Sequence, residues 1–180
     1  MPDNFLYTTP LDERAKPLID ELTYEYSTRY GDYFDGPSEM ARYPAELFAP
    51  PDGAFLLLMR DGVAIGGGAF KRYDEQTAEL KRVWTRKDLR RQGLARKVLE
   101  ELEAQVVRQG YTKVYLTTGF RQPEAAGLYL TSGYTALFDT TVDPEVHGKL
   151  PFEKDLSHLA VDVSFVTRDT EAARTGTHDS

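Results

Sequence analysis

The chain has 180 residues, 41% hydrophobic and 28% charged, a composition typical of one folded domain rather than of a disordered segment. Its formal net charge of −7 disfavours nucleic acid and anionic membranes as partners and favours cationic small molecules. The absence of cysteine excludes disulfides, thiolate metal sites and cysteine nucleophiles. We see no secretory signal and no apolar run long enough for a membrane span, and therefore expect a cytoplasmic protein.

The chain begins with helical periodicity. Apolar residues at three- and four-residue spacing predict an amphipathic helix whose regular part begins at Pro17 and which ends at Gly31. Its inward stripe comprises Leu11, Ala15, Leu18, Leu22 and Tyr26. Residues 38–48 predict a short helix interrupted at Pro44, and residues 50–53 a loop.

A run of strands follows. Residues 55–59 are continuously apolar and residues 63–70 continue after Asp61-Gly62, a dipeptide typical of hairpin turns. Residues 78–85 predict a third strand, entered from a polar turn. The order predicts that the first two of these strands are antiparallel.

The strongest helix signal lies between residues 94 and 110. Gly110 is expected to cap it, and its apolar stripe comprises Leu94, Val98, Leu99, Leu102 and Val106. Residues 114–118 and 152–156 predict strands, and residues 123–130 a helix. The whole order predicts an α/β fold with a mixed, mainly antiparallel central sheet and flanking helices, in which the long helix crosses between two parallel strands.

A basic loop links the third strand to the long helix. The first N–H groups of a helix have no intrahelical partner and the helix dipole is positive there, so a glycine-containing loop at this point favours an anion. Gly93 allows a phosphate close to the backbone and Ala95 is small, while Arg90, Arg91 and Arg96 add charge. The structural alternative is a solvated basic turn that caps a core helix.

Other phosphate and metal motifs do not fit. The loop has one of the three glycines of a dinucleotide fingerprint and no Gly-Lys-Ser/Thr ending. A nucleic-acid interface is disfavoured by the net charge and by the lack of a reading motif. His147, His158 and His178 have no partners at metal-ligand spacing, so we expect no metal.

Three segments resemble the GNAT acetyltransferase superfamily, in order and at the right spacing over about residues 55–156. Residues 79–86 followed by Arg90-Arg91-Gln92-Gly93-Leu94-Ala95 resemble its coenzyme A motif, with Arg90, Gly93 and Ala95 in the defining positions. Residues 117–134 resemble the strand and helix that follow, and residues 152–156 the closing strand. Arg91 stands where many members have Gly, and Gln122 where Asn is commoner.

The resemblance implies one GNAT-like acyl-CoA N-acyltransferase domain over residues 1–167, and the polar, Gly/Thr/Asp-rich composition of residues 168–180 predicts a C-terminal tail. It implies acetyl-CoA as co-substrate and direct attack of an amine on the thioester. The backbone of the strand before the loop is expected to bind the pantetheine arm. The cofactor-binding residues implied are Val83, Trp84, Thr85, Arg90, Arg91, Gln92, Gly93, Leu94, Ala95, Arg96 and Gln122.

Two residues are candidates for acid–base catalysis. Tyr129 occupies the position where the family often keeps a tyrosine that protonates the leaving thiolate, and a phenol stays protonated at neutral pH. Its alternative role is a half-buried anchor for its helix. Glu79 is the candidate base, or else a surface residue paired with Lys81 or Arg82. Residues 66–68, three glycines, would leave room for substrate or form a β-bulge.

The sequence therefore predicts an N-acetyltransferase that acts on a small-molecule amine. A protein lysine or N-terminus is the alternative acceptor, and a non-catalytic acyl-CoA sensor or interaction module is the alternative class. No nucleic acid or membrane partner is expected, and a homodimer stays open.

Overall fold

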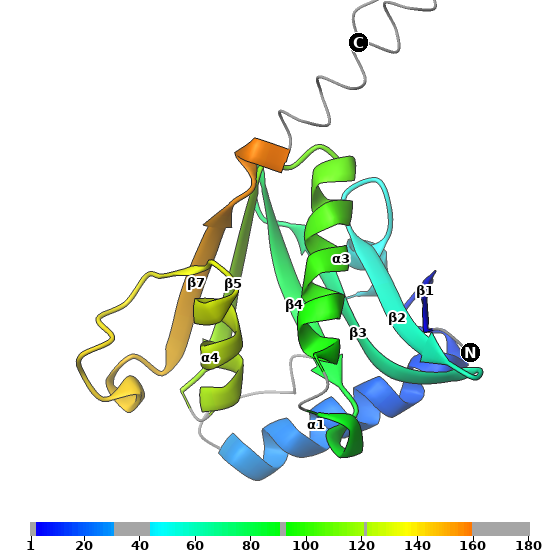
Figure 1. The fold of residues 1–180 in the computed structure, drawn as a ribbon, viewed down its shortest axis with the longest axis horizontal. Helices are drawn as coiled ribbons and strands as arrows, with labels where there is room; N and C mark the ends of the chain where they lie inside the picture. The colour runs from blue at the N-terminus through cyan, green and yellow to red at the C-terminus, as the bar shows by residue number, and fades with distance from the viewer. Residues whose placement is uncertain (1–2, 31–43, 91–92, 121, 160–180) are drawn as a thin grey trace, which may run out of the picture.

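The computed structural model describes residues 3–30, 44–90, 93–120 and 122–159. Within these residues the chain forms one seven-stranded sheet with helices on its two faces (Figure 1). The strands are β1 (Asn4–Tyr7), β2 (Ala54–Arg60), β3 (Val63–Arg72), β4 (Thr77–Thr85), β5 (Lys113–Gly119), β6 (Thr135–Ala136) and β7 (Lys149–Asp155). The helices are α1 (Lys16–Tyr30), α3 (Leu94–Arg108) and α4 (Pro123–Thr131), with 3-10 turns η1 (Glu13–Ala15), η2 (Ala45–Phe48), η3 (Lys87–Leu89) and η4 (Pro144–Val146).

The sheet has the order β1-β2-β3-β4-β5-β7-β6. β4 and β5 are parallel and joined by α3, whereas the other neighbouring pairs are antiparallel. The predicted fold class, with the long helix crossing between two parallel strands, is confirmed.

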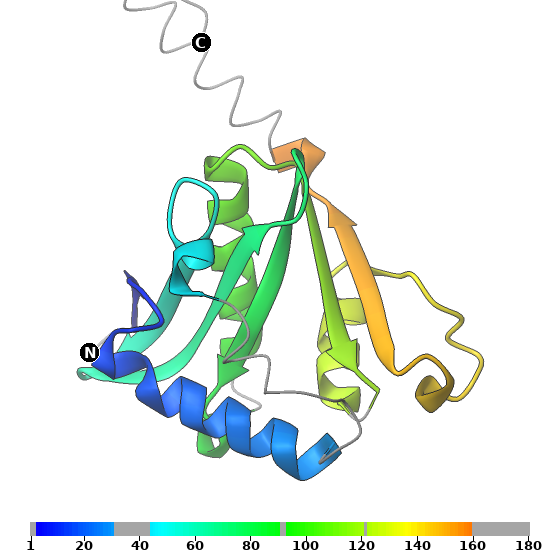
Figure 2. The ribbon, with the colours of Figure 1, turned by 180° about the vertical axis from the view of Figure 1, so that it is seen from behind.

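Helices cover both faces of the sheet. α3 and α4 lie on one face, and α1 crosses the other (Figures 1 and 2). The five predicted apolar residues of α3 are all buried, and Gly110 follows the helix with a φ of 100°. Leu11, expected in the stripe of the first helix, lies before α1 and is 79% exposed, because η1 separates it from the regular helix.

The parallel pair β4–β5 opens along its length. The two strands pair only over their first three residues, up to Glu79 opposite Tyr115. Beyond that point β4 stays paired with β3 and β5 with β7, so the two strands separate toward their carboxyl ends (Figure 1). We call this opening the splay. It leaves one backbone edge of residues 80–85 without a β5 partner, next to the start of α3.

A β-bulge shapes β4 within the splay. The β3–β4 register shifts between Gly67 and Ala69, and Arg82 has a φ of 60°, a conformation that non-glycine residues rarely adopt. The β-bulge weighed for the three glycines of β3 thus lies in the strand opposite them, because two steps in β3 (Gly67 to Ala69) face three in β4 (Trp84 to Lys81). The glycines do not leave room for substrate: a Cβ on Gly67 would lie 2.8 Å from Leu18 Cδ1, and one on Gly68 2.7 Å from Leu102 Cδ1.

Two short strands complete the sheet at its edges. β1 pairs with β2 at one edge of the sheet, and β6 pairs with β7 at the other. Of the predicted helix over residues 38–48, the described part is η2, which begins directly after Pro44. Residues 38–43, Gly31 and the predicted tail lie outside the described residues.

Candidate active site

The splay holds two adjoining cavities. The outer cavity lies among the end of β4, the loop after it, the start of α3 and α4. Ten of the predicted site residues line it: Val83, Trp84, Thr85, Arg90, Gly93, Leu94, Ala95, Arg96, Gln122 and Tyr129. Arg91 and Gln92 lie outside the described residues, and Glu79 lines neither cavity. The residues predicted around the coenzyme A motif are thus brought together.

The start of α3 is open on the side of the outer cavity. Gly93 has a φ of 76°, and a Cβ built there would meet no atom within 4 Å. The first intrahelical hydrogen bond runs from Lys97 N to Gly93 O, so the amides of the three residues between them point out of the helix end. Backbone donors and the positive end of the helix dipole therefore face the outer cavity at a point that a phosphate can approach closely.

The β4 edge contributes its backbone rather than all its side chains. The Trp84 indole is 2% exposed and packs on the α1 side of the sheet, where its Nε1 donates to Glu21 Oε1 at 3.0 Å. Val83 instead packs against the core on the α3 side. An extended arm lying in the outer cavity would therefore meet Trp84 through its main chain.

The inner cavity, of about 130 Å³, lies deeper between β4 and β5. Its charged lining residues are Lys81, Arg82, Lys149 and Glu25. It shares six lining residues with the outer cavity: Leu22, Glu25, Val83, Gln122, Ala125 and Tyr129. These six define the junction, where a group held in the outer cavity would meet one held in the inner cavity.

Tyr129 stands at the junction. Its ring packs against Tyr134 and Phe152, with centroid distances of 5.4 and 5.6 Å, and the residue is 7% exposed. Burial raises the pKa of the Tyr129 hydroxyl above its ordinary value. The group therefore keeps its proton at neutral pH and can act as a donor. The alternative role predicted for Tyr129, anchoring its helix, also fits, because its ring is packed against the core.

Glu79 occupies a different place from the one predicted. It is 8% exposed rather than on the surface, and its carboxylate lies 3.2 Å from Lys71 Nζ and 3.4 Å from Lys81 Nζ. The pairing with Lys81 was the predicted alternative. Glu79 sits at the closed end of the splay, and its partner Lys81, unlike Glu79 itself, lines the inner cavity.

Gln122 ties the end of β5 to the start of α4. Its Oε1 accepts from Gly119 N at 3.1 Å and from Thr118 Oγ1 at 3.4 Å. Across the outer cavity, Arg96 Nη2 lies 3.3 Å from Thr131 Oγ1, which links α3 to α4. These contacts hold the two helices that flank the cavity.

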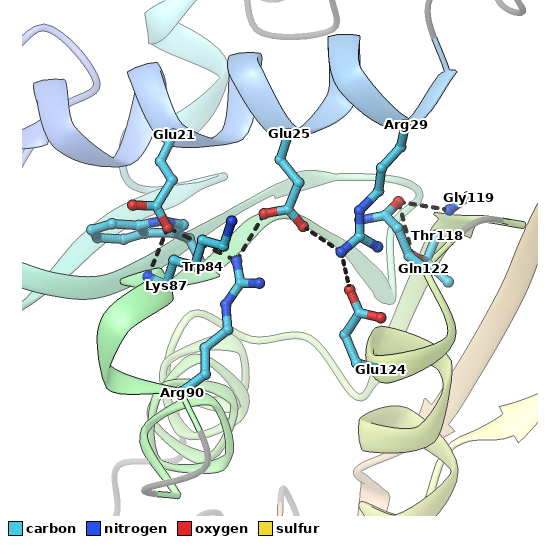
Figure 3. Close-up of polar contacts among 10 residues, drawn as sticks. All are labelled: Glu21, Glu25, Arg29, Trp84, Lys87, Arg90, Thr118, Gly119, Gln122 and Glu124. Carbon is cyan, nitrogen blue, oxygen red and sulfur yellow. Dashed lines mark hydrogen bonds and ion pairs between the residues drawn. The ribbon is translucent and has the colours of Figure 1, made fainter.

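Helix α1 supplies carboxylates that the sequence did not reveal as part of the site. Glu21, Glu25 and Arg29 follow at four-residue spacing and point toward the loop after β4 and the start of α4 (Figure 3). Glu25 Oε2 accepts from Arg90 Nη2 at 2.8 Å, and Glu25 Oε1 lies 3.3 Å from Arg29 Nη2. Arg29 also pairs with Glu124 of α4. The four-residue spacing of charges was the available signal, but it does not say what the helix faces.

Within the described residues, no group of three His, Asp or Glu side chains is placed to hold a metal ion. None of the helices described there is long and apolar enough to cross a membrane.

Comparison with known proteins connects this geometry to a family. A crystal structure from Klebsiella pneumoniae assigned as an acyl-CoA N-acyltransferase is 25% identical, with a TM-score of 0.67 over 86% of this chain and 97% of that one. The PaiA N-acetyltransferase of Thermoplasma acidophilum in complex with coenzyme A is 18% identical, with a TM-score of 0.63 over 86% and 99%. A GNAT acetyltransferase of Elizabethkingia anophelis with acetyl-CoA bound is 14% identical, with a TM-score of 0.57 over 86% and 98%.

No curated protein matches the chain significantly. The Acetyltransferase (GNAT) family model, however, matches residues 19–134. That range includes α1 from Ile19 onward, the splay, the start of α3 and Tyr129. The chain therefore belongs to the GNAT family of acetyltransferases.

Proposed function

We propose that the protein transfers an acetyl group from acetyl-CoA to the amine of a small molecule. The observation that carries the proposal is the junction. One cavity offers a helix N-terminus and a free strand edge, the other offers polar side chains, and the two meet beside Tyr129. Solved structures of this fold with coenzyme A or acetyl-CoA bound support the choice of donor.

The chain's residues fit this donor. The backbone amides at the start of α3, with Arg90 and Arg96, would hold the pyrophosphate, and the main chain of Val83, Trp84 and Thr85 would bind the pantetheine arm. Acetyl-CoA supplies an activated acyl group as a thioester. A backbone N–H at the β4 edge would donate to the thioester carbonyl oxygen as negative charge develops on it.

Tyr129 is proposed as the proton donor to the leaving sulfur. It is buried, lies at the junction and keeps its proton at neutral pH. Such general-acid help typically accelerates a reaction ~10²–10⁴-fold. Glu79 remains the proton acceptor that the sequence proposes, but between two lysines it would act only through intervening water.

A small acceptor is favoured by the size of the inner cavity and by the position of α1. The cavity of about 130 Å³ suits a compact amine, and α1 lies across the open end of the splay (Figure 3). A protein acceptor would have to bring a lysine or an N-terminus through the same opening.

The test is acetyl-CoA-dependent release of thiol with a panel of amines. Because the chain contains no cysteine, a thiol-specific reagent reports only the coenzyme A released. We expect release that depends on one class of small primary amine, with the acetylated product confirmed by mass spectrometry. Tight coenzyme A binding with no transfer to any small amine, peptide lysine or peptide N-terminus would favour the sensor alternative.

A further inference from the structure

We propose that Glu25 is the carboxylate that binds the acceptor's ammonium group and takes its proton, and that Arg90 holds this carboxylate until the donor's pyrophosphate draws Arg90 away. The inference rests on the proposed function. It assigns to α1 a catalytic residue outside the coenzyme A motif.

Glu25 has the right position. It lines both cavities, as Tyr129 does, so a proton donor and a proton acceptor would share the junction. Among the described residues that line the inner cavity, Glu25 is the one carboxylate, and the other charged groups are the cations Lys81, Arg82 and Lys149. An ammonium group entering this cavity would meet one negatively charged partner there.

The contacts of Glu25 link it to the donor site. Its Oε2 accepts from Arg90 Nη2 at 2.8 Å, and Arg90 belongs to the loop proposed to hold the pyrophosphate. A pyrophosphate carries more negative charge than a carboxylate and would compete for the same guanidinium. Moving Arg90 toward it would leave Oε2 able to accept an N–H from the acceptor.

Glu21 would keep α1 in place during this exchange. Its Oε1 accepts from Lys87 N at 2.8 Å and from Trp84 Nε1 at 3.0 Å, and lies 3.8 Å from Arg90 Nη2 (Figure 3). The first two contacts do not involve Arg90. The helix would therefore stay docked on the end of β4 while the Glu25–Arg90 contact is exchanged.

The proton balance follows from these positions. The acceptor enters as an ammonium ion, and Glu25 takes one proton, which passes to solvent. The nitrogen lone pair then forms the bond to the carbonyl carbon, and the C–S bond breaks with its electron pair going to sulfur. Sulfur receives a proton from Tyr129, and the amide nitrogen gives up its second proton, which restores the phenol through solvent.

Other charged groups face Glu25 from each neighbouring element. Arg29 of α1 lies 3.3 Å from Oε1 and is shared with Glu124 of α4, and Arg90 approaches from the loop. The inner cavity adds its three cations. Because Arg29 stays in place in our account, Oε1 keeps its position while Oε2 changes partner.

The experiment compares Glu25→Gln with Asp20→Asn, which removes the same charge from an exposed site on the same helix. Three quantities are measured: kcat/KM for the acceptor against pH, the Kd of coenzyme A by calorimetry, and Tm. For Glu25→Gln we expect acceptor kcat/KM to fall ~100-fold or more at neutral pH and to recover as the pH approaches the amine's own pKa of ~10.4. We expect coenzyme A to bind as well or several-fold more tightly, because Arg90 has lost a competitor. Asp20→Asn should match the wild type.

Two results would overturn the inference. The first is an acceptor kcat/KM of Glu25→Gln equal to that of an active wild type. The second is weaker coenzyme A binding by Glu25→Gln than by the wild type, which would show that Glu25 only positions Arg90 for the donor. The Kd of coenzyme A can be measured even if the protein is inactive. A wild type that transfers to no amine would therefore count against the proposed function. The change in coenzyme A affinity would still test whether Arg90 exchanges Glu25 for the pyrophosphate.

Discussion

Glycines stand at two places near the splay, and their surroundings differ. The three glycines of β3 lie where little space is left: an added Cβ would meet Leu18 of α1 from Gly67 and Leu102 of α3 from Gly68 at less than 3 Å, and one on Gly66 would lie 3.2 Å from the Trp84 carbonyl oxygen. Gly93 stands at the start of α3, where an added Cβ would meet nothing within 4 Å. The first group lets two helices approach the sheet closely, and the second leaves a backbone surface open to a ligand. Glycine in a motif therefore indicates function only when the space beside it is open.

The largest effect is expected from filling the packed region. In Gly67→Val the Cβ would lie 2.7 Å from the Leu56 carbonyl oxygen as well as against Leu18, so backbone would have to move. We expect a loss of roughly 3–5 kcal/mol in the free energy of unfolding, measured by urea denaturation. The control is Gly127→Ala in α4, where a Cβ meets open space and stability should rise by about 0.5–1 kcal/mol. Equal stability of the two variants would contradict the comparison.

Tyr129 belongs to both kinds of region, since its ring is packed and the residue also lines both cavities. Tyr129→Phe keeps the ring and deletes the donor, so folding and coenzyme A affinity should survive while kcat falls ~10²–10⁴-fold. Raising the pH should not restore the rate, because the leaving sulfur still lacks a proton donor. Tyr24→Phe, at a residue 70% exposed on α1, is the control. A kcat equal to that of the wild type would remove Tyr129 from the chemistry.

The open region is tested by Gly93→Glu. A negatively charged side chain there would repel the pyrophosphate, and we expect ~100-fold weaker coenzyme A binding by calorimetry with the fold retained. Gly110→Glu is a matched control, because Gly110 also has a positive φ and open space but lies at the other end of α3. Both variants share the strain of a left-handed residue, about 1 kcal/mol. Similar coenzyme A affinities in the two would disprove binding of the pyrophosphate at the start of α3.

The smallest effect is expected at Glu79. Two carboxylates can be compared in the same way as the glycines. Glu79 lies between two lysines at the closed end of the splay, whereas Glu25 lies at the junction of the two cavities. If Glu25 accepts the proton, Glu79→Gln should lower kcat less than about tenfold, with no rescue at high pH. A loss that exceeds that of Glu25→Gln, and that high pH restores, would return the role to Glu79.

The sequence predicted those parts of the molecule whose causes are local. The stripe of α3 follows from helical spacing, and the donor-site residues are contiguous around one loop that marks a helix start. A four-residue edge strand such as β1 has little periodicity, and it exists because β2 offers a partner.

The acceptor side depends on contacts between distant segments. Glu25 and Arg90 are 65 positions apart, and the spacing of charges on α1 does not show that the helix crosses the splay. The alternation that placed Glu79 beside the cleft is interrupted by the bulge at Arg82, and its lysine partner Lys71 comes from the neighbouring strand. The positions of Glu25 and of Glu79 relative to the cavities therefore depend on the tertiary arrangement, which the sequence pattern does not give.

The most direct test of the account is a titration of the ¹⁵N-labelled protein with coenzyme A, followed by NMR. We expect the largest amide shifts at Val83, Trp84 and Thr85 on the β4 edge and at Gly93, Leu94 and Ala95 at the start of α3, with small shifts in β1 and β2. Such a pattern would place the donor in the splay. Saturable binding whose shifts gather elsewhere, or no binding at millimolar coenzyme A, would contradict the assignment of the splay as the acetyl-CoA site.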